Sequence, residues 1–166
     1  ELHRVAGADG NVLSALGSLA DGMWMRGDLD RAIRLARDAL EQHRQSPFSG
    51  RVSRAYAQAN LFGMLVEHGD LAEAQAMGRQ LLPELGELGI AHGWSDHYAS
   101  CLARCGSVES AVRLVGWADA LRLARGLRRQ PNEERARDAT LALARAGASA
   151  ADLDRFIATY GQNPVF

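Results

Sequence analysis

The stretch "GDLDRAIRLARDAL" at residues 27–40 returns in altered form as "GDLAEAQAMGRQLL" at residues 69–82. A weaker third copy, "GSVESAVRLVGWAD", occupies residues 106–119. Repetition at a spacing of about 20–50 residues is the signature of a repeat architecture. The chain is therefore expected to be built from one helical unit used three times. In the first two copies the matching positions are Gly27, Asp28, Leu29, Ala32, Arg37 and Leu40, and Gly69, Asp70, Leu71, Ala74, Arg79 and Leu82. In the third copy Gly106, Val108, Ala111, Val112, Leu114 and Ala118 match Gly27, Leu29, Ala32, Ile33, Leu35 and Ala39 of the first.

Each copy has the features of a helical hairpin. The glycine can end one helix in the left-handed conformation, which costs glycine little. The following Asp28, Asp70 or Ser107 can cap the next helix by accepting from its free N–H groups. The small alanine four or five residues later lets the two helices approach closely. One apolar face of each hairpin stays uncovered, so the hairpins are expected to stack on one another.

Helical signals dominate the rest of the chain, and no alternating strand pattern stands out. We expect one all-α domain over residues 1–166, with three hairpins at about 12–45, 51–88 and 94–128 and capping helices at about 132–160. The eight predicted helices cover residues 12–26, 28–45, 51–68, 70–88, 94–105, 107–128, 132–146 and 149–160.

Three local features qualify this pattern. Pro83 removes a backbone hydrogen bond and should kink or end the fourth helix. Residues 149–160 carry one apolar stripe and should close the open end of the stack. Gly116 is expected to touch a neighbouring helix, and Trp117 is expected to be mostly buried against the terminal helices.

Composition excludes several classes of protein. The net charge of the 166-residue chain is −1, so no overall field favours nucleic acid or an anionic membrane. All basic residues are arginine, which leaves no lysine for a Schiff base or a phosphate-binding loop. Two cysteines are too few for a disulfide framework and favour a reduced, cytoplasmic setting. No apolar run reaches the length of a membrane span. Because the first residue is Glu1, we expect a piece of a longer chain.

The repeated residues resemble the tetratricopeptide repeat, in which a glycine–aspartate turn joins two helices and an alanine follows. The third copy departs from that pattern at Ser107. The large aromatic residue expected early in the first helix is also replaced, by Leu16, Gln58 and Ser95. The resemblance implies a right-handed α-α superhelix of about eight helices.

Two further segments are similar to the C-terminal helical domain of large bacterial transcriptional regulators, the signal-transduction ATPase or LuxR-type class. "ESAVRLVGWADALR" at residues 109–122 is similar to the motif that ends that domain. "NEERARDATLALARAG" at residues 132–147 resembles the helix that follows the motif. The resemblance spans about residues 12–147. The family's nucleotide-binding and DNA-binding motifs are absent, so neither activity is carried over to this chain.

One spacing deserves a test as a metal site. His97, Cys101 and Cys105 lie at i, i+4 and i+8 of one predicted helix, and all three can ligate zinc. His92 or Asp96 could supply a fourth ligand. Structural zinc cysteines usually occur as close pairs, however, and free cysteine is commonly buried in a core. Ordinary helix residues are the favoured interpretation, and no metal site or cofactor is expected.

No catalytic pattern emerges. Ser95, Asp96 and His97 are consecutive, and consecutive residues of a helix do not face one another as a triad must. The "RGD" at Arg26–Asp28 is explained by the repeat. The basic concentration favours a solvated helix face with local ion pairs over a contact with nucleic acid or an acidic partner; its members are Arg122, Arg125, Arg128, Arg129, Arg135 and Arg137. We expect no enzyme.

The inner surface of the stack is the favoured binding site, because repeat superhelices present extended concave surfaces. In the tetratricopeptide family this surface comes chiefly from the first helix of each pair. Carried onto this sequence, the resemblance points to Asp21, Trp24, Tyr56, Asn60, Asp96, His97 and Arg104. Aromatic anchors beside polar groups suit a peptide, a protein domain or a small ligand.

Two functions follow as hypotheses. The first is a non-enzymatic interaction or effector-sensing domain of a cytoplasmic bacterial transcriptional regulator. Its partners would be a protein or peptide, other domains of the same chain, or a small effector, without direct contact to nucleic acid or membrane. The second is a stand-alone scaffold that assembles partners and has no transcriptional role.

Overall fold

Helices fill almost all of the chain that the computed structural model describes, residues 15–46 and 49–147. No strand occurs in those ranges, so the all-α prediction is confirmed there. Seven predicted helices are found, with ends within three residues of the prediction wherever both ends are described, and a short 3-10 helix is added. The eighth prediction, 149–160, falls outside the described ranges. The elements are a first helix at residues 15–25, α2 (Leu29–Gln45), α3 (Arg51–His68), α4 (Leu71–Glu87), η1 (Ala91–Trp94), α5 (Ser95–Arg104), α6 (Val108–Arg125) and α7 (Pro131–Gly147).

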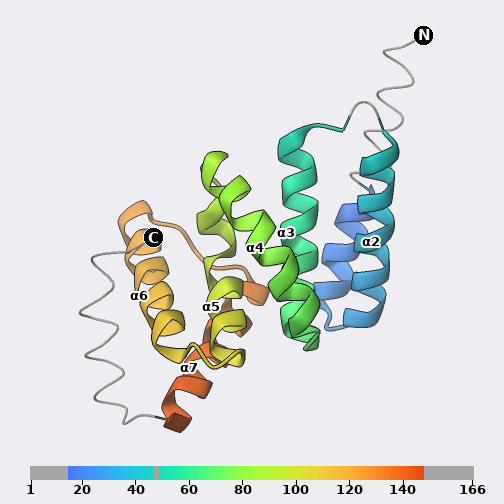
Figure 1. Ribbon diagram of the computed structural model, residues 1–166. Coiled ribbons are helices and arrows are strands. Elements are labelled where there is room, and N and C mark those ends of the chain that lie inside the picture. The colour runs from blue at the N-terminus through green and yellow to red at the C-terminus, as the bar shows by residue number, and fades with distance from the viewer. Residues whose placement is uncertain (1–14, 47–48, 148–166) are drawn as a thin grey trace.

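Neighbours in sequence are neighbours in space along most of the fold. In Figure 1 the chain runs from α2 at the right, through α3 and α4, to α5 and α6 at the left. Each of these helices packs on the next one. Helix α7 departs from the row, because it lies against both α5 and α6. Helix α5 therefore contacts α3, α4, α6 and α7, and it is the central element of the fold.

The repeat is visible in the three turns that it predicts. Gly27, Gly69 and Gly106 all have positive φ, at 82°, 106° and 87°. In each turn the residue after the glycine donates its N–H to the carbonyl five residues earlier, which closes the preceding helix. The three bonds are Asp28 to Met23 at 3.0 Å, Asp70 to Leu65 at 3.0 Å and Ser107 to Leu102 at 2.9 Å.

The predicted side-chain caps are only partly found. Asp28 accepts from the N–H of Arg31 at 3.3 Å. Neither Asp70 nor Ser107 makes a side-chain cap, so the prediction is wrong for these two residues. The Asp70 carboxylate instead pairs with the imidazole of His68, 3.0 Å away. The small residues behave as expected, since the repeated alanines are fully buried: Ala32, Ala74 and Ala111.

Pro83 does not end its helix. Helix α4 continues past it to Glu87. Pro83 lies on the exposed side of the helix. Water can therefore reach the carbonyl that loses its partner, which reduces the cost of an interior proline.

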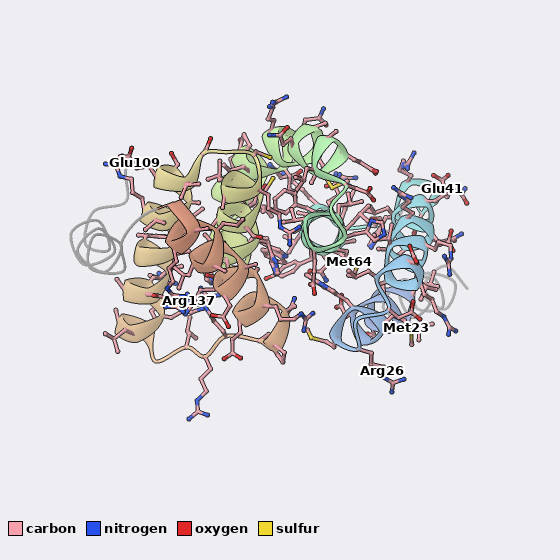
Figure 2. All side chains as sticks on the ribbon, turned by 90° about the horizontal axis from the view of Figure 1, so that it is seen from below. Met23, Arg26, Glu41, Met64, Glu109 and Arg137 are labelled. Carbon is pink, nitrogen blue, oxygen red and sulfur yellow. The ribbon has the colours of Figure 1, made fainter. Side chains whose placement is uncertain are left out.

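The apolar interior forms two clusters. The larger one lies among the first helix, α2, α3, α4 and α5, and its largest fully buried members include Trp24, Phe62 and Met64. Figure 2 shows Met64 inside the molecule and Glu41 and Glu109 at its edges. The smaller cluster joins α5, α6 and α7 through small side chains, namely Ala99, Ala103, Ala111, Val112, Val115, Leu141 and Ala144.

A close approach between helices occurs at Gly63 in the middle of α3. A Cβ atom added there would lie 2.6 Å from Cη2 of Trp24 and 3.3 Å from Cδ2 of His97. The sequence expectation placed such a contact at Gly116. Gly116 is indeed buried, and Trp117 is partly buried. The crowding that positions Trp24 nevertheless comes from Gly63, which the sequence analysis did not single out.

Replacing Gly63 with alanine should destabilise the protein by about 1–3 kcal/mol, the usual cost of overpacking a core. In an uncrowded helix the same change would stabilise by about 1 kcal/mol, because alanine is the better helix former. The sign of the change therefore tests the contact with Trp24. Urea denaturation of the wild type and Gly63→Ala measures it.

Gly86→Ala is the matched control. Gly86 also lies in a helix, and nothing stands within 4 Å of a Cβ added there. Its free energy of unfolding should rise, by up to about 1 kcal/mol, because alanine is the better helix former and meets no neighbour there. Equal stability of the two variants would contradict the packing described at Gly63.

Candidate functional site

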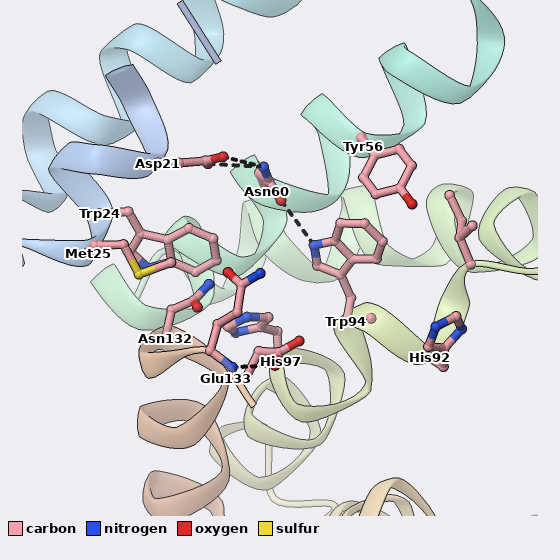
Figure 3. Close-up of a pocket in the computed structure, with 13 residues that line it drawn as sticks. Asp21, Trp24, Met25, Tyr56, Asn60, His92, Trp94, His97, Asn132 and Glu133 are labelled. Carbon is pink, nitrogen blue, oxygen red and sulfur yellow. Dashed lines mark hydrogen bonds between the residues drawn. The ribbon is translucent and has the colours of Figure 1, made fainter. Parts of the chain in front are cut away.

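A pocket of about 300 Å³ opens where the first helix, α3, η1, α5 and the start of α7 meet. Figure 3 shows the side chains that surround it. Five of the seven residues predicted for the inner surface line this pocket: Asp21, Trp24, Tyr56, Asn60 and His97. The structure thus brings together side chains from three helices that lie far apart in the sequence.

Asp96 and Arg104 do not belong to this site. Asp96 is 0% exposed and points away from the pocket into a group of arginines. Consecutive residues of a helix project about 100° apart, and here His97 lines the pocket while Asp96 does not. Arg104 is exposed at the end of α5 and does not line the pocket. The prediction of a surface role is therefore wrong for Asp96, and for Arg104 it stays a prediction.

Aromatic rings form much of the pocket wall. The Trp24 and His97 rings lie with centroids 5.0 Å apart and planes tilted by 41°. Tyr56 meets Trp94 edge to face at 5.0 Å. Trp24 is almost fully buried, whereas Tyr56 is 44% exposed and lies at the pocket's edge. Such a wall suits a ligand with an apolar or cationic part.

A chain of hydrogen bonds crosses the pocket from one helix to the next. The Asn60 amide donates to both carboxylate oxygens of Asp21, at 3.0 and 3.2 Å. The carbonyl oxygen of the same amide accepts from the Trp94 indole at 3.2 Å. Asn60 is therefore held in one orientation. Burial raises the pKa of Asp21, and the hydrogen bond from Asn60 offsets part of that rise.

A second network holds Trp24 from behind. Its indole N–H donates to Glu67 at 2.6 Å. Glu67 also accepts from Arg135 at 2.7 Å, and Arg135 donates to the backbone oxygen of Trp24 at 3.3 Å. Because Arg135 belongs to α7, this network ties the last described helix to the first.

Asn132 presents an unused acceptor at the pocket. The residue is 5% exposed and belongs to the first turn of α7. Its Oδ1 atom is buried and has no hydrogen-bond partner among the described residues. A buried acceptor left without a partner costs about 1–3 kcal/mol. Native proteins keep few such atoms, and in a pocket a ligand donor would satisfy it.

His97 is neutral at physiological pH. The residue is 2% exposed. Burial, followed by the charges of Arg135 and Arg122, lowers its pKa to about 3. A neutral imidazole offers one acceptor and one donor nitrogen. His97 therefore brings no positive charge to the pocket.

A group of buried ion pairs positions α7, and with it Asn132. Asp96 accepts two hydrogen bonds from Arg129, at 3.0 and 3.1 Å, and pairs with Arg122 at 3.1 Å. Asp119 accepts from Arg137 in α7 at 2.9 and 3.1 Å. Burial opposes ionisation of Asp119, but the hydrogen bond and charge of Arg137, with those of Arg129, lower its pKa overall.

These contacts correct part of the expectation of a solvated basic face, in which Arg125 and Arg128 are exposed as predicted. Local ion pairing is present, as predicted. Arg122, however, is buried, and Arg129 and Arg137 are largely enclosed rather than solvated. The arginines act between helices, because their carboxylate partners lie on α5, α6 and α7 as well as in α3.

The proposed zinc ligands do not converge. Cys101 is buried in the larger apolar cluster, whereas Cys105 is exposed. Burial, with a smaller effect of Cys105, raises the pKa of the Cys101 thiol to about 12. Across residues 15–46 and 49–147 no three His, Cys, Asp or Glu side chains are placed to hold a metal ion.

Several pocket residues escaped the sequence analysis. Trp94 and His92 come from η1, a four-residue turn that periodicity does not reveal. Gln130, Asn132 and Glu133 enter because α7 folds back against the row of helices. The only available signal was Pro131, which marks the first position of a helix but not where that helix packs.

No family model, curated protein or solved structure matches the chain. Within the described ranges, no helix is both long and apolar enough to cross a membrane.

His97 predicts that acid destabilises the fold between about pH 6.5 and about pH 3. The folded protein keeps the imidazole neutral, with its pKa lowered to about 3, whereas the unfolded chain takes up a proton near 6.5. The unfolded state then binds more protons. The free energy of unfolding should fall by up to about 1.4 kcal/mol per pH unit as the pH drops through this window. Denaturant titrations at several pH values measure the slope.

His97→Gln is the comparison protein, because it cannot titrate. Asp21 has a raised pKa and contributes the opposite slope, since the folded state then binds more protons. It is present in both proteins, so the difference between the two curves isolates His97. Parallel curves would show that His97 is not buried in its neutral form.

Proposed function

We propose that this chain is a non-enzymatic sensing domain that binds a small ligand in the pocket between the first helix, α3 and α7. The observation that carries the proposal is the buried, unpartnered Oδ1 of Asn132 in a pocket walled by aromatic rings. Clefts of this kind, with a few convergent polar groups, are the usual form of a small-ligand site.

The pocket's size supports a small ligand over a long peptide. Its volume of about 300 Å³ lies at the lower end of the range for ligand sites, about 300–1,000 Å³. Helix α7 also covers part of the surface that an open stack of hairpins would offer to a peptide. The ligand would be enclosed between helices rather than laid along them.

Binding can be passed to other parts of a protein because the pocket joins distant segments. Asp21 belongs to the first helix, and Asn132 to the last described helix. A ligand that touches both favours the arrangement in which α7 is docked. The ligand can shift the equilibrium between docked and undocked α7 only by the difference between its affinities for these two arrangements.

The place of the domain in a bacterial transcriptional regulator is part of the same proposal. It is supported by the three glycine turns with one backbone geometry, the feature on which the resemblance to tetratricopeptide repeats depends. A right-handed superhelix of such hairpins is compatible with the packing of each helix on the next.

The three tryptophans provide a direct test. Trp24 and Trp94 line the pocket, whereas Trp117 does not. In a screen of small fragments by NMR, a ligand in the pocket should shift the indole N–H signals of Trp24 and Trp94 and leave that of Trp117 unchanged. A chemically diverse library that produces no such pattern would sink the proposed function.

Asn132→Leu separates binding from stability. Leucine has nearly the same shape and removes the unpartnered acceptor, so the free energy of unfolding should stay within about 1 kcal/mol of the wild type or rise. Fragments that bind the wild type should bind this variant at least about tenfold more weakly, the effect of about 1.4 kcal/mol. Unchanged affinity would show that Asn132 takes no part in binding.

A further inference from the structure

We propose that the ligand of this pocket carries a primary ammonium group, so that the site recognises a small organic amine. The inference rests on the proposed function, because it concerns the chemistry of the same pocket. Three independent features support it: the charge of the lining, the balance of hydrogen-bond donors and acceptors, and the aromatic wall.

The first feature is an uncompensated negative charge. No ion pair joins Asp21 to another residue in the described ranges, and its carboxylate is bonded only to the neutral amide of Asn60. Among the described residues no arginine lines the pocket, and the chain has no lysine. Arg122 and Arg135, whose charges act on His97, are already paired with carboxylates.

The second feature is a pair of hydrogen-bond acceptors, on Asp21 and Asn132. The indole N–H groups of Trp24 and Trp94 are already donated, to Glu67 and Asn60. The Asn60 amide N–H groups are directed to Asp21. Acceptors remain on the Asp21 carboxylate and on the unpartnered Oδ1 of Asn132. The Tyr56 hydroxyl and the amides of Gln130 and Asn132 can also donate into the pocket. An ammonium group nevertheless suits the two acceptors, because it brings three donors and accepts none.

The third feature is the ring faces. In Figure 3 Asn60 lies between Asp21 and the ring of Trp94, and Trp24 lies between Asp21 and Asn132. A cation within about 6 Å of an aromatic ring is attracted by its negative face, and more strongly where water is excluded. The rings also cover the carbon atoms next to the ammonium group. Charge, hydrogen bonds and rings thus favour the same ligand.

The same features disfavour an anion. A carboxylate or phosphate in the pocket would face Asp21 and the partly buried Glu133. Like charges in a partly desolvated site repel strongly. His97 could compensate only as an imidazolium, and burial lowers its pKa to about 3. The site therefore discriminates by charge as well as by size.

Benzylamine, benzyl alcohol and benzoate form a matched set of probes, because they share one ring and differ in the charge of the attached group. Titration into the protein at pH 7, followed by the indole signals of Trp24 and Trp94, measures each affinity. Benzylamine should bind at least about tenfold more tightly than benzyl alcohol, which corresponds to about 1.4 kcal/mol. Benzoate should bind more weakly than the alcohol.

Asp21→Asn tests the source of the preference. Asparagine keeps the shape of the side chain and an acceptor for Asn60 but removes the charge. Benzylamine should lose about tenfold or more in affinity, while benzyl alcohol should be unchanged. Asp38→Asn makes the same chemical change on the exposed face of α2, away from the pocket, and should leave both affinities unaltered. Thermal melts show whether each variant is folded.

The outcomes separate the two proposals. If benzylamine binds no more tightly than benzyl alcohol, or if Asp21→Asn weakens both equally, the ammonium inference is overturned while the pocket stands as a ligand site. If benzylamine shifts neither indole signal but other fragments do, the same conclusion holds. Only the absence of any pocket-binding fragment removes the proposed function as well.

Discussion

The arrangement of the molecule depends on the buried carboxylate of Asp96. It lies in α5, the helix that contacts α3, α4, α6 and α7, and it holds the guanidinium groups of Arg122 and Arg129. Removing one partner of a buried pair typically costs about 3–5 kcal/mol, because a charge is left without compensation. Asp96 thereby fixes the segment between α6 and α7 against α5.

The apolar contacts around α7 could not by themselves fix the position of this helix. The cluster that joins α5, α6 and α7 consists of alanine, valine and one leucine, and such side chains bury little area each. Small apolar surfaces permit several alignments of α7 on α5 and α6. Directional hydrogen bonds between guanidinium and carboxylate groups select one of them. The ion pair between Arg135 and Glu67 extends the same principle to the first half of the chain. The pocket lies at this junction, with walls from the repeated helices and from the helix that folds back on them.

Much of the fold could be predicted from the sequence because its causes are local. Helix positions follow from apolar periodicity, and the turns follow from Gly27, Gly69 and Gly106, whose positive φ values require a residue without a Cβ atom. Five pocket residues were also predicted, since the repeat places equivalent positions on one face. Asp96 was assigned wrongly because the repeat indicates which helix faces inward but not how far each helix is rotated.

By itself, therefore, the sequence determined an all-α chain of hairpins with glycine turns, and it showed that every cation is an arginine. Only the tertiary structure decided where α7 docks. It also decided that the ring of Trp24 packs against Gly63 and that Asn132 and Asp21 line the same pocket. The physical reason is range. Helices and turns depend on residues within about five positions of one another. The pocket joins residues more than a hundred positions apart, through packing and ion pairs that no local pattern encodes.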